Sequence, residues 1–295
     1  MGYEWLALLA AFLWAFSSMI SVTPARHLGT FAYSRWRMAC VTLMLCSAAT
    51  FMSGWSSLLH QDYAVMALSG LIGIFIGDTA LFACFNRVGP RRAGLLFSCH
   101  AVFSAILGVW LFDESLYGWK LVGAILVFSG VLLAVFFGQN KRAHSWEKVN
   151  GNLWIAISLG LTAALCQSLG AIIAKPVMSS GSDPIAASAI RMATALTAHC
   201  VLFCCGFKIA KASSPMNWSI LGQVALNGFL AMGVGMTLIM IALSRGDVGM
   251  VGLLSSTTPI MILPLMWLFT RQRPSLLSWV GAILAVAGTG MILKF

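Results

Sequence analysis

Among the polar and aromatic residues within the apolar stretches of this 295-residue sequence, eight have side chains that we select as candidates for binding a small molecule. In a hydrocarbon layer such groups are costly, so they normally face a cavity or a bonding partner. Arginine and aspartate could pair with a carboxylate or an amine, while histidine and the amides could form hydrogen bonds. The candidate ligand contacts are Trp14, Arg37, Asp78, His100, Gln167, Arg191, Asn227 and Thr258.

Each candidate also has a purely structural explanation. For Asp78, in the middle of LIGIFIGDTALF, a buried ion pair explains the residue as well as proton or substrate coupling does. A hydrogen bond to a neighbouring helix accounts equally for His100, and it is the preferred explanation for Thr258. Packing is the commoner role of a tryptophan such as Trp14 in an apolar segment. These alternatives stay open at the level of sequence.

Arg37 and Asp78 are predicted to form an ion pair. Arg37 lies eight residues after Gly29, and Asp78 lies nine residues before Arg87. At 1.5 Å per helical residue, both side chains lie about 12 to 14 Å from the same edge of the apolar layer. Residues that share a depth can meet across a helix interface, where a counter-ion offsets the cost of burial.

The sequence contains no recognisable catalytic motif. It has no HExxH, GxSxG or paired-carboxylate motif, and His100 and His199 are far apart with no evident acid partner. The eight cysteines form no CxxC pair and no zinc-type spacing with histidine, so neither a metal nor another cofactor is expected. A channel is disfavoured because no ring of like charges or selectivity loop is visible. The sequence therefore disfavours an enzyme.

The elements that must position these residues are apolar segments long enough to cross a bilayer. Hydrophobic residues make up 60% of the chain and charged residues 9%, unlike any soluble domain. A spanning helix needs about 20 apolar residues, and continuous apolarity favours helices over the alternating strands of a barrel. Ten segments qualify: 4–22, 31–53, 63–85, 93–112, 118–138, 152–174, 184–206, 218–243, 248–270 and 276–294.

Two other readings of the chain are disfavoured. The beginning, MGYEWLALLAAFLW, has no basic residue ahead of its apolar run and no cleavage site, so it is expected to remain as the first helix. The net charge of +10 resides in short loops, with no basic domain that could hold a nucleic acid. The charge therefore concerns the bilayer.

The second half of the sequence repeats the first. VGAIL occurs at 122–126 and at 280–284, and the same shift of 158 residues aligns several glycines, a threonine and an arginine. Because each half has five segments, an odd number, the halves must cross the membrane in opposite senses. Such an inverted repeat can expose one central site alternately to each side. The charges are not fully repeated, since Asp78 aligns with Met236 and Glu114 with Gln272.

Glycines in both copies of VGAIL-x-x-x-G share a helix face, so segments 118–138 and 276–294 are predicted to pack closely together. These glycines are Gly123, Gly130, Gly281 and Gly288. Packing is likewise the preferred role of the glycines in segment 63–85. Glu114 is predicted to cap the helix that follows it, and Lys175 to anchor its segment at the membrane interface.

Residues 71–135 resemble the EamA-type unit of the drug/metabolite transporter superfamily. The resemblance rests on the glycines of segment 63–85, the small-residue turn into segment 93–112, Glu114, and the spacing of VGAILVFSG. The three final segments resemble the same unit and include the proline typical of the family, Pro259, although Ala101 stands at the equivalent place in the first half.

The resemblance implies an all-α polytopic membrane protein with ten transmembrane helices in two inverted five-helix repeats. The first EamA repeat would cover residues 1–140, a linker 141–151, and the second repeat 152–295. It also implies a multi-pass protein of the bacterial inner membrane with both termini in the cytoplasm. The loop charges give the opposite orientation, with the linker in the cytoplasm and both termini outside.

The function implied by the resemblance is secondary active transport by alternating access. The expected substrate is a small polar or amphipathic metabolite, an amino acid or derivative first, and a nucleotide-type or cationic metabolite or drug second. The expected partners are this substrate and the lipid bilayer, with proton or substrate counter-transport, no nucleic acid, and a monomeric or homodimeric state.

Overall fold

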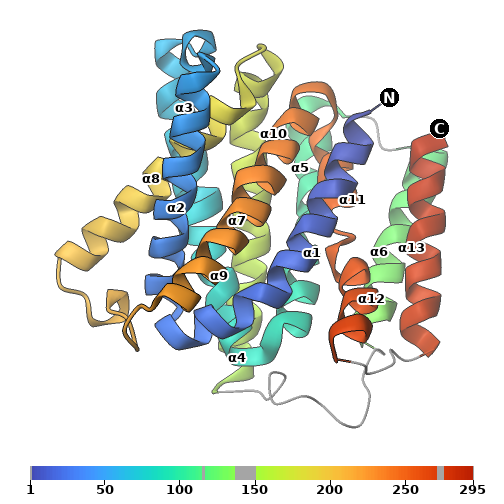
Figure 1. Ribbon diagram of the computed structural model, residues 1–295. Helices are drawn as coiled ribbons and strands as arrows, with labels where there is room; N and C mark the ends of the chain where they lie inside the picture. Colours follow the sequence, from blue (N-terminus) through green and yellow to red (C-terminus); the bar gives the residue numbers. More distant parts are fainter. Residues whose placement is uncertain (1, 115–116, 137–150, 271–275, 295) are drawn as a thin grey trace.

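The computed structural model describes residues 2–114, 117–136, 151–270 and 276–294, and this part of the chain contains helices but no strands. The helices form a bundle in which α1 begins and α13 ends at the same end (Figure 1). They are α1 (Tyr3–Leu28), α2 (Thr30–Phe51), α3 (His60–Gly70), α4 (Gly77–Ser98), α5 (His100–Phe112), α6 (Trp119–Phe136), α7 (Leu153–Ser179), α8 (Pro184–Cys204), α9 (Trp218–Gly228), α10 (Met236–Arg245), α11 (Val248–Ser255), α12 (Thr258–Thr270) and α13 (Leu276–Lys294).

Short segments of other helical types connect some of these helices. The π-helical segments η2 (Leu71–Ile76) and η5 (Phe229–Gly235) join α3 to α4 and α9 to α10, so each pair forms one continuous rod. Two 3-10 turns, η1 (Gly54–Ser57) and η4 (Lys208–Ala210), follow α2 and α8.

The described helices are apolar enough for a polytopic membrane protein. Seven of them, counting continuous rods, are long and apolar enough to cross a bilayer, and two shorter apolar stretches accompany them at Leu121–Gly130 and Trp279–Gly288. The predicted class, an all-helical multi-pass membrane protein, is confirmed. The seven are Tyr3–Leu28, His60–Gly89, Arg92–Phe112, Leu153–Ser179, Pro184–Cys204, Trp218–Arg245 and Val248–Leu265.

Two helices extend beyond the ends of the predicted segments by more than four residues. α1 continues to Leu28 rather than ending at 22, and α7 continues to Ser179 rather than ending at 174. The final turns carry polar or basic side chains and one proline each, Pro24 and Pro176. Because the predicted boundaries followed apolarity alone, they ended before these turns.

The predicted packing of α6 against α13 is confirmed. A Cβ atom added at Gly130 would lie 2.7 Å from the backbone nitrogen of Ala285, and one at Gly288 would lie 2.8 Å from that of Val127. Only glycine leaves room for backbones to approach this closely. The repeated pentapeptide therefore encodes a helix-to-helix contact.

Glycines also bring η2 against α7. A Cβ atom at Gly73 would lie 3.2 Å from the Cα atom of Gly170, and one at Gly77 would lie 2.9 Å from the Cβ atom of Cys166. These two glycines therefore pack against α7, which places η2 and the start of α4 directly beside it, and both also line the cavity described below.

The prediction for Glu114 was wrong, and Lys175 has partners that the sequence did not indicate. Glu114 accepts hydrogen bonds from the backbone nitrogens of Val248 and Gly249, so it caps α11 and not the following helix. The Lys175 ammonium donates to the carbonyl oxygens of Leu243 and Gly246, at the end of α10. Both side chains reach a distant helix end because tertiary packing brings its unpaired backbone groups within range.

Candidate functional site

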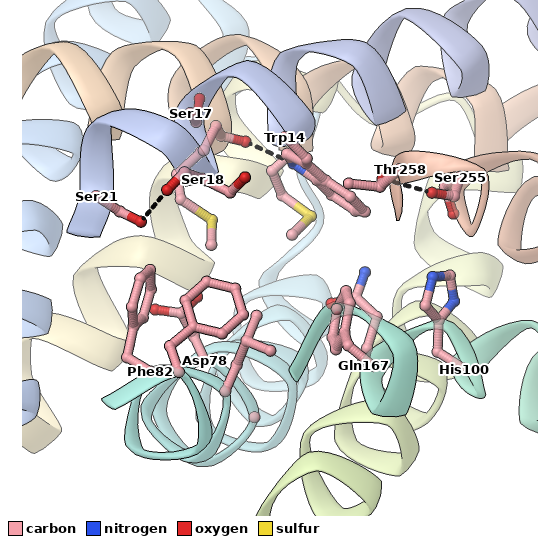
Figure 2. A pocket seen from close by; sticks show the side chains of 18 of the residues that line it. Trp14, Ser17, Ser18, Ser21, Asp78, Phe82, His100, Gln167, Ser255 and Thr258 are labelled. Atoms are coloured by element: carbon pink, nitrogen blue, oxygen red, sulfur yellow. Dashed lines mark hydrogen bonds between the residues drawn. The ribbon is translucent and has the colours of Figure 1, made fainter. Parts of the chain in front are cut away.

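A cavity lies among α1, α4, α7, α12 and the rod of α9, η5 and α10. It offers about 90 Å³ to the centres of water molecules, which is room for several of them. Its hydroxyl-bearing lining residues are Ser17, Ser18, Ser21, Ser98, Ser255, Ser256 and Thr258, and its aromatic ones are Trp14, Phe82, Phe85 and Phe97. Figure 2 shows α1 on one side of the cavity, with α4 and α7 opposite.

The structure brings seven of the eight candidate residues to this cavity. They are Trp14, Arg37, Asp78, His100, Gln167, Asn227 and Thr258. The eighth, Arg191, is not among the lining residues. Side chains that are separated by up to 244 positions in the sequence, from Trp14 to Thr258, thus converge on one space.

A buried polar network forms one wall of the cavity. Arg37 and Asp78 form the predicted ion pair, with side chains only 2% and 6% exposed, so that prediction is confirmed. Arg37 also donates to the Asn227 Oδ1 atom at 3.2 Å, and the Tyr33 hydroxyl donates to the same oxygen at 2.8 Å. Asn227 in turn donates to the Ser17 carbonyl at 2.7 Å. The network ties α2 and α4 to α1 and α9, and the pairing offsets the cost of burying two charges.

Close packing of α9 on α2 places Asn227 against Arg37. A Cβ atom at Gly228 would lie 3.2 Å from the Cγ atom of Arg37 and 2.8 Å from a methyl carbon of Val41. The guanidinium carbon of Arg37 also lies 4.6 Å from the centre of the Phe82 ring, a cation–π contact. A residue larger than glycine at 228 would separate the arginine from the amide.

The indole of Trp14 forms a second wall. Its Nε1 atom donates to the Ala231 carbonyl in η5 at 2.9 Å, and its ring meets that of Phe97 edge-on with centres 6.5 Å apart. A Cβ atom at Gly235 would lie only 2.9 Å from the same nitrogen, so the glycine makes room for the indole. This wall could hold an apolar or aromatic part of a ligand.

His100 and Gln167 line the far part of the cavity, on the side of α5 and α7 (Figure 2). His100 is 1% exposed, and its Nε2 atom has no hydrogen-bond partner among the described residues. Its ring centre lies 5.0 Å from that of Phe97. A buried nitrogen without a partner is costly, so a ligand that reached it would gain a hydrogen bond. Thr258 instead donates to the Ser255 carbonyl at 2.8 Å, a partner three residues earlier in the same predicted segment rather than on a neighbouring one.

Arg191 lies behind the cavity rather than on it. Its side chain is 1% exposed, and its NH1 atom donates to the sulfur of Met240 at 3.3 Å. The guanidinium sits beside the backbones of Gly73 and Gly170, and Gly73 separates it from the cavity. Within the described ranges no carboxylate pairs with it.

The serines of α1 were missed at the level of sequence. Ser17, Ser18 and Ser21 recur at spacings of three and four residues, which places them toward one side of a helix. That spacing could have indicated a polar face on this helix. Serines in membrane helices, however, commonly donate a hydrogen bond to a carbonyl of their own helix, as Ser18 does to the Ala15 carbonyl, so serines were not selected as ligand contacts.

Comparisons with known proteins agree with this architecture. The model of the EamA-like transporter family matches residues 1–136 and 154–294 of the chain. An uncharacterized transporter of Synechocystis sp., sll1164, is 21% identical over 242 residues, which are 81% of this chain and 67% of that protein. A solved crystal structure superimposes with a TM-score of 0.76 over 98% of this chain and 95% of its own, at 16% identity, and so shares the fold.

Proposed function

This chain belongs to the EamA-like transporter family of membrane transporters, and from that premise we propose that it is a secondary active transporter. In this proposal a small polar or amphipathic metabolite, an amino acid or a derivative first, crosses the cytoplasmic membrane through the cavity by alternating access. The substrate leaves chemically unchanged, so the protein is a carrier and not an enzyme.

The observation that carries the proposal is the Arg37–Asp78 pair in the cavity wall. Of the two carboxylate oxygens of Asp78, only Oδ2 has a hydrogen-bond partner among the described residues. An amino acid brings an ammonium and a carboxylate, which match the two charges of the pair, and its side chain could lie against the ring of Trp14. A site of this kind, in which a few polar groups converge within an apolar cavity, is typical of small-molecule binding.

The proposal includes ten spans in two inverted halves, with the substrate at their interface. The symmetry of the glycine contacts supports it, since Gly130 meets the chain at Gly281 and Gly288 meets it at Gly123. Both π-helical segments support it too, because η2 shifted by 158 residues falls on η5. Two equivalent halves can exchange conformations at nearly equal free energy, as alternating access requires.

Counterflow in proteoliposomes tests the proposed function. Proteoliposomes that contain the purified protein and are loaded with a mixture of unlabelled amino acids should accumulate a labelled amino acid from outside with saturable kinetics. Asp78→Asn and Arg37→Gln should each lower the transport rate at least about tenfold, which corresponds to about 1.4 kcal/mol. The reason is that each change removes one of the two charges offered to the substrate.

The matched control is Arg35→Gln. Arg35 lies on the same helix, but it donates to the Ala210 carbonyl and is not part of the cavity lining. Its loss should leave the transport rate within about twofold of wild type. Normal transport by Asp78→Asn would contradict a role of the pair in transport, and absence of counterflow with every amino acid would contradict the proposed substrate class.

A further inference from the structure

The turn between α10 and α11 is held from both sides by charged residues of other helices. The Lys175 ammonium, on α7, donates to the carbonyls of Leu243 at 2.8 Å and Gly246 at 2.6 Å. The Glu114 carboxylate, just after α5, accepts from the backbone nitrogens of Val248 at 2.6 Å and Gly249 at 2.8 Å. The cation meets the negative end of α10 and the anion meets the positive end of α11, so helix dipoles strengthen all four bonds.

Two glycines, Gly246 and Gly249, allow other helices to pack closely against this turn. A Cβ atom at Gly249 would lie 3.2 Å from a carboxylate oxygen of Glu114 and 3.1 Å from the Cα atom of Ala105. The ring of Tyr3, at the start of α1, packs directly on Gly246. All eight residues of α11 are buried. The end of the bundle that carries this turn is therefore tightly packed.

The cavity lies away from that end. Its lining residues on α1 begin at Trp14 and extend to Ser21, toward the helix end at Leu28. Those on α4 flank the turn at Gly89, lying between Gly77 and Phe85 before it and between Gly94 and Ser98 after it. This turn and the α10–α11 turn stand at opposite ends of the bundle (Figure 1). The cavity is thus displaced from the end where the charged residues act.

The internal repeat shows that the arrangement is one-sided. A shift of 158 residues places the α10–α11 turn on the turn at Gly89 and Glu114 on Gln272, which lies outside the described residues. The shift that aligns Pro176 with Pro24 places Lys175 on Thr23. In the sequence, the positions equivalent to Glu114 and Lys175 are therefore both occupied by uncharged residues.

We propose that Glu114 and Lys175 form a latch that keeps the cavity closed at the α10–α11 end. Together they join α7 and the end of α5 to the α10–α11 turn, so that opening at this end must break their four bonds. Because the residues equivalent to Glu114 and Lys175 in the repeat, Gln272 and Thr23, are uncharged, the resting carrier favours opening at the Gly89 end. The inference rests on the proposed alternating access and adds which gate is locked and by which residues.

Cysteine accessibility tests the latch without any substrate. In a cysteine-free background, Val251→Cys reports on the latched end, since Val251 is 2% exposed on α11, and Ser18→Cys reports on the cavity. Proteoliposomes of defined orientation are treated from either side with a membrane-impermeant maleimide. Glu114→Gln and Lys175→Met should each raise the labelling rate at position 251 at least about fivefold from the latched side. They should lower the labelling rate at position 18 from the opposite side. Lys175→Arg, which keeps charge and donors, should stay near wild type.

The control is Glu4→Gln, another acid at the same end of the bundle, whose hydrogen-bond partner among the described residues is the backbone nitrogen of Gly2. It should change neither rate. Unchanged labelling in the latch variants, or equal increases at both reporters together with a lower melting temperature, would show that the two residues only stabilise the fold. Failure of counterflow in wild-type protein would overturn the proposed function, whereas the labelling result decides the latch by itself.

Discussion

Replacing Arg37 by methionine should lower the free energy of unfolding by about 3 to 5 kcal/mol, the usual cost of removing one partner from a buried ion pair. Asp78 would remain in a site where only 6% of it is exposed, without the counter-ion that Arg37 provides. The change can be measured as the shift in denaturant or thermal midpoint of the protein in detergent.

Arg191→Met is the matched control, because it removes an equally buried arginine that has no paired carboxylate in the described ranges. It should leave the free energy of unfolding within about 1 kcal/mol of wild type or raise it, since an unpaired buried charge is itself costly. An equal loss of stability in both variants would show that the two arginines act mainly through packing.

The double variant Arg37→Met/Asp78→Leu separates structure from function. Apolar residues of similar size often replace a buried ion pair at little cost, so most of the stability lost in Arg37→Met should return. Transport should not return, because the charges offered to the substrate are gone. A double variant that transports at the wild-type rate would assign the pair a structural role only.

Alanine at Gly130 or Gly288 should push α6 away from α13. The added carbon at Gly288 would lie 2.6 Å from the Gly123 carbonyl oxygen and 2.8 Å from the Val127 nitrogen, and backbone atoms cannot move aside as a flexible side chain can. Overpacking of this kind costs about 1 to 3 kcal/mol per site. The double variant should lose more, as seen in its melting temperature.

Gly222→Ala provides the control for these glycines. Gly222 lies in α9, and an added Cβ atom there meets nothing within 4 Å. Alanine should stabilise this exposed helical position by about 0.5 to 1 kcal/mol. If Gly130→Ala proves as stable as Gly222→Ala, α6 and α13 can separate freely, and the close contact does not hold them together.

Some features could be predicted from sequence because they depend on depth or on a repeated pattern. Arg37 and Asp78 share a depth, and VGAIL-x-x-x-G occurs twice, so their contacts followed from helix geometry alone. The partners of Glu114 and Lys175 could not be predicted, since an acid before one helix gives no sign that it caps another. Arg191 was a candidate ligand contact like Arg37, but the position equivalent to Asp78 is Met236, and nothing in the local sequence places Arg191 behind Gly73.

The pairing of α6 with α13 has a consequence for how the protein is made. The partner of α6 begins 140 residues after α6 ends, because α6 ends at Phe136 and α13 begins at Leu276. At a synthesis rate of about 5 to 20 residues per second, α6 waits about 7 to 28 s for α13. During that interval its glycine face meets lipid or insertion factors instead of a helix. Membrane quality control therefore has a defined period in which an unfinished chain can be distinguished from a finished one.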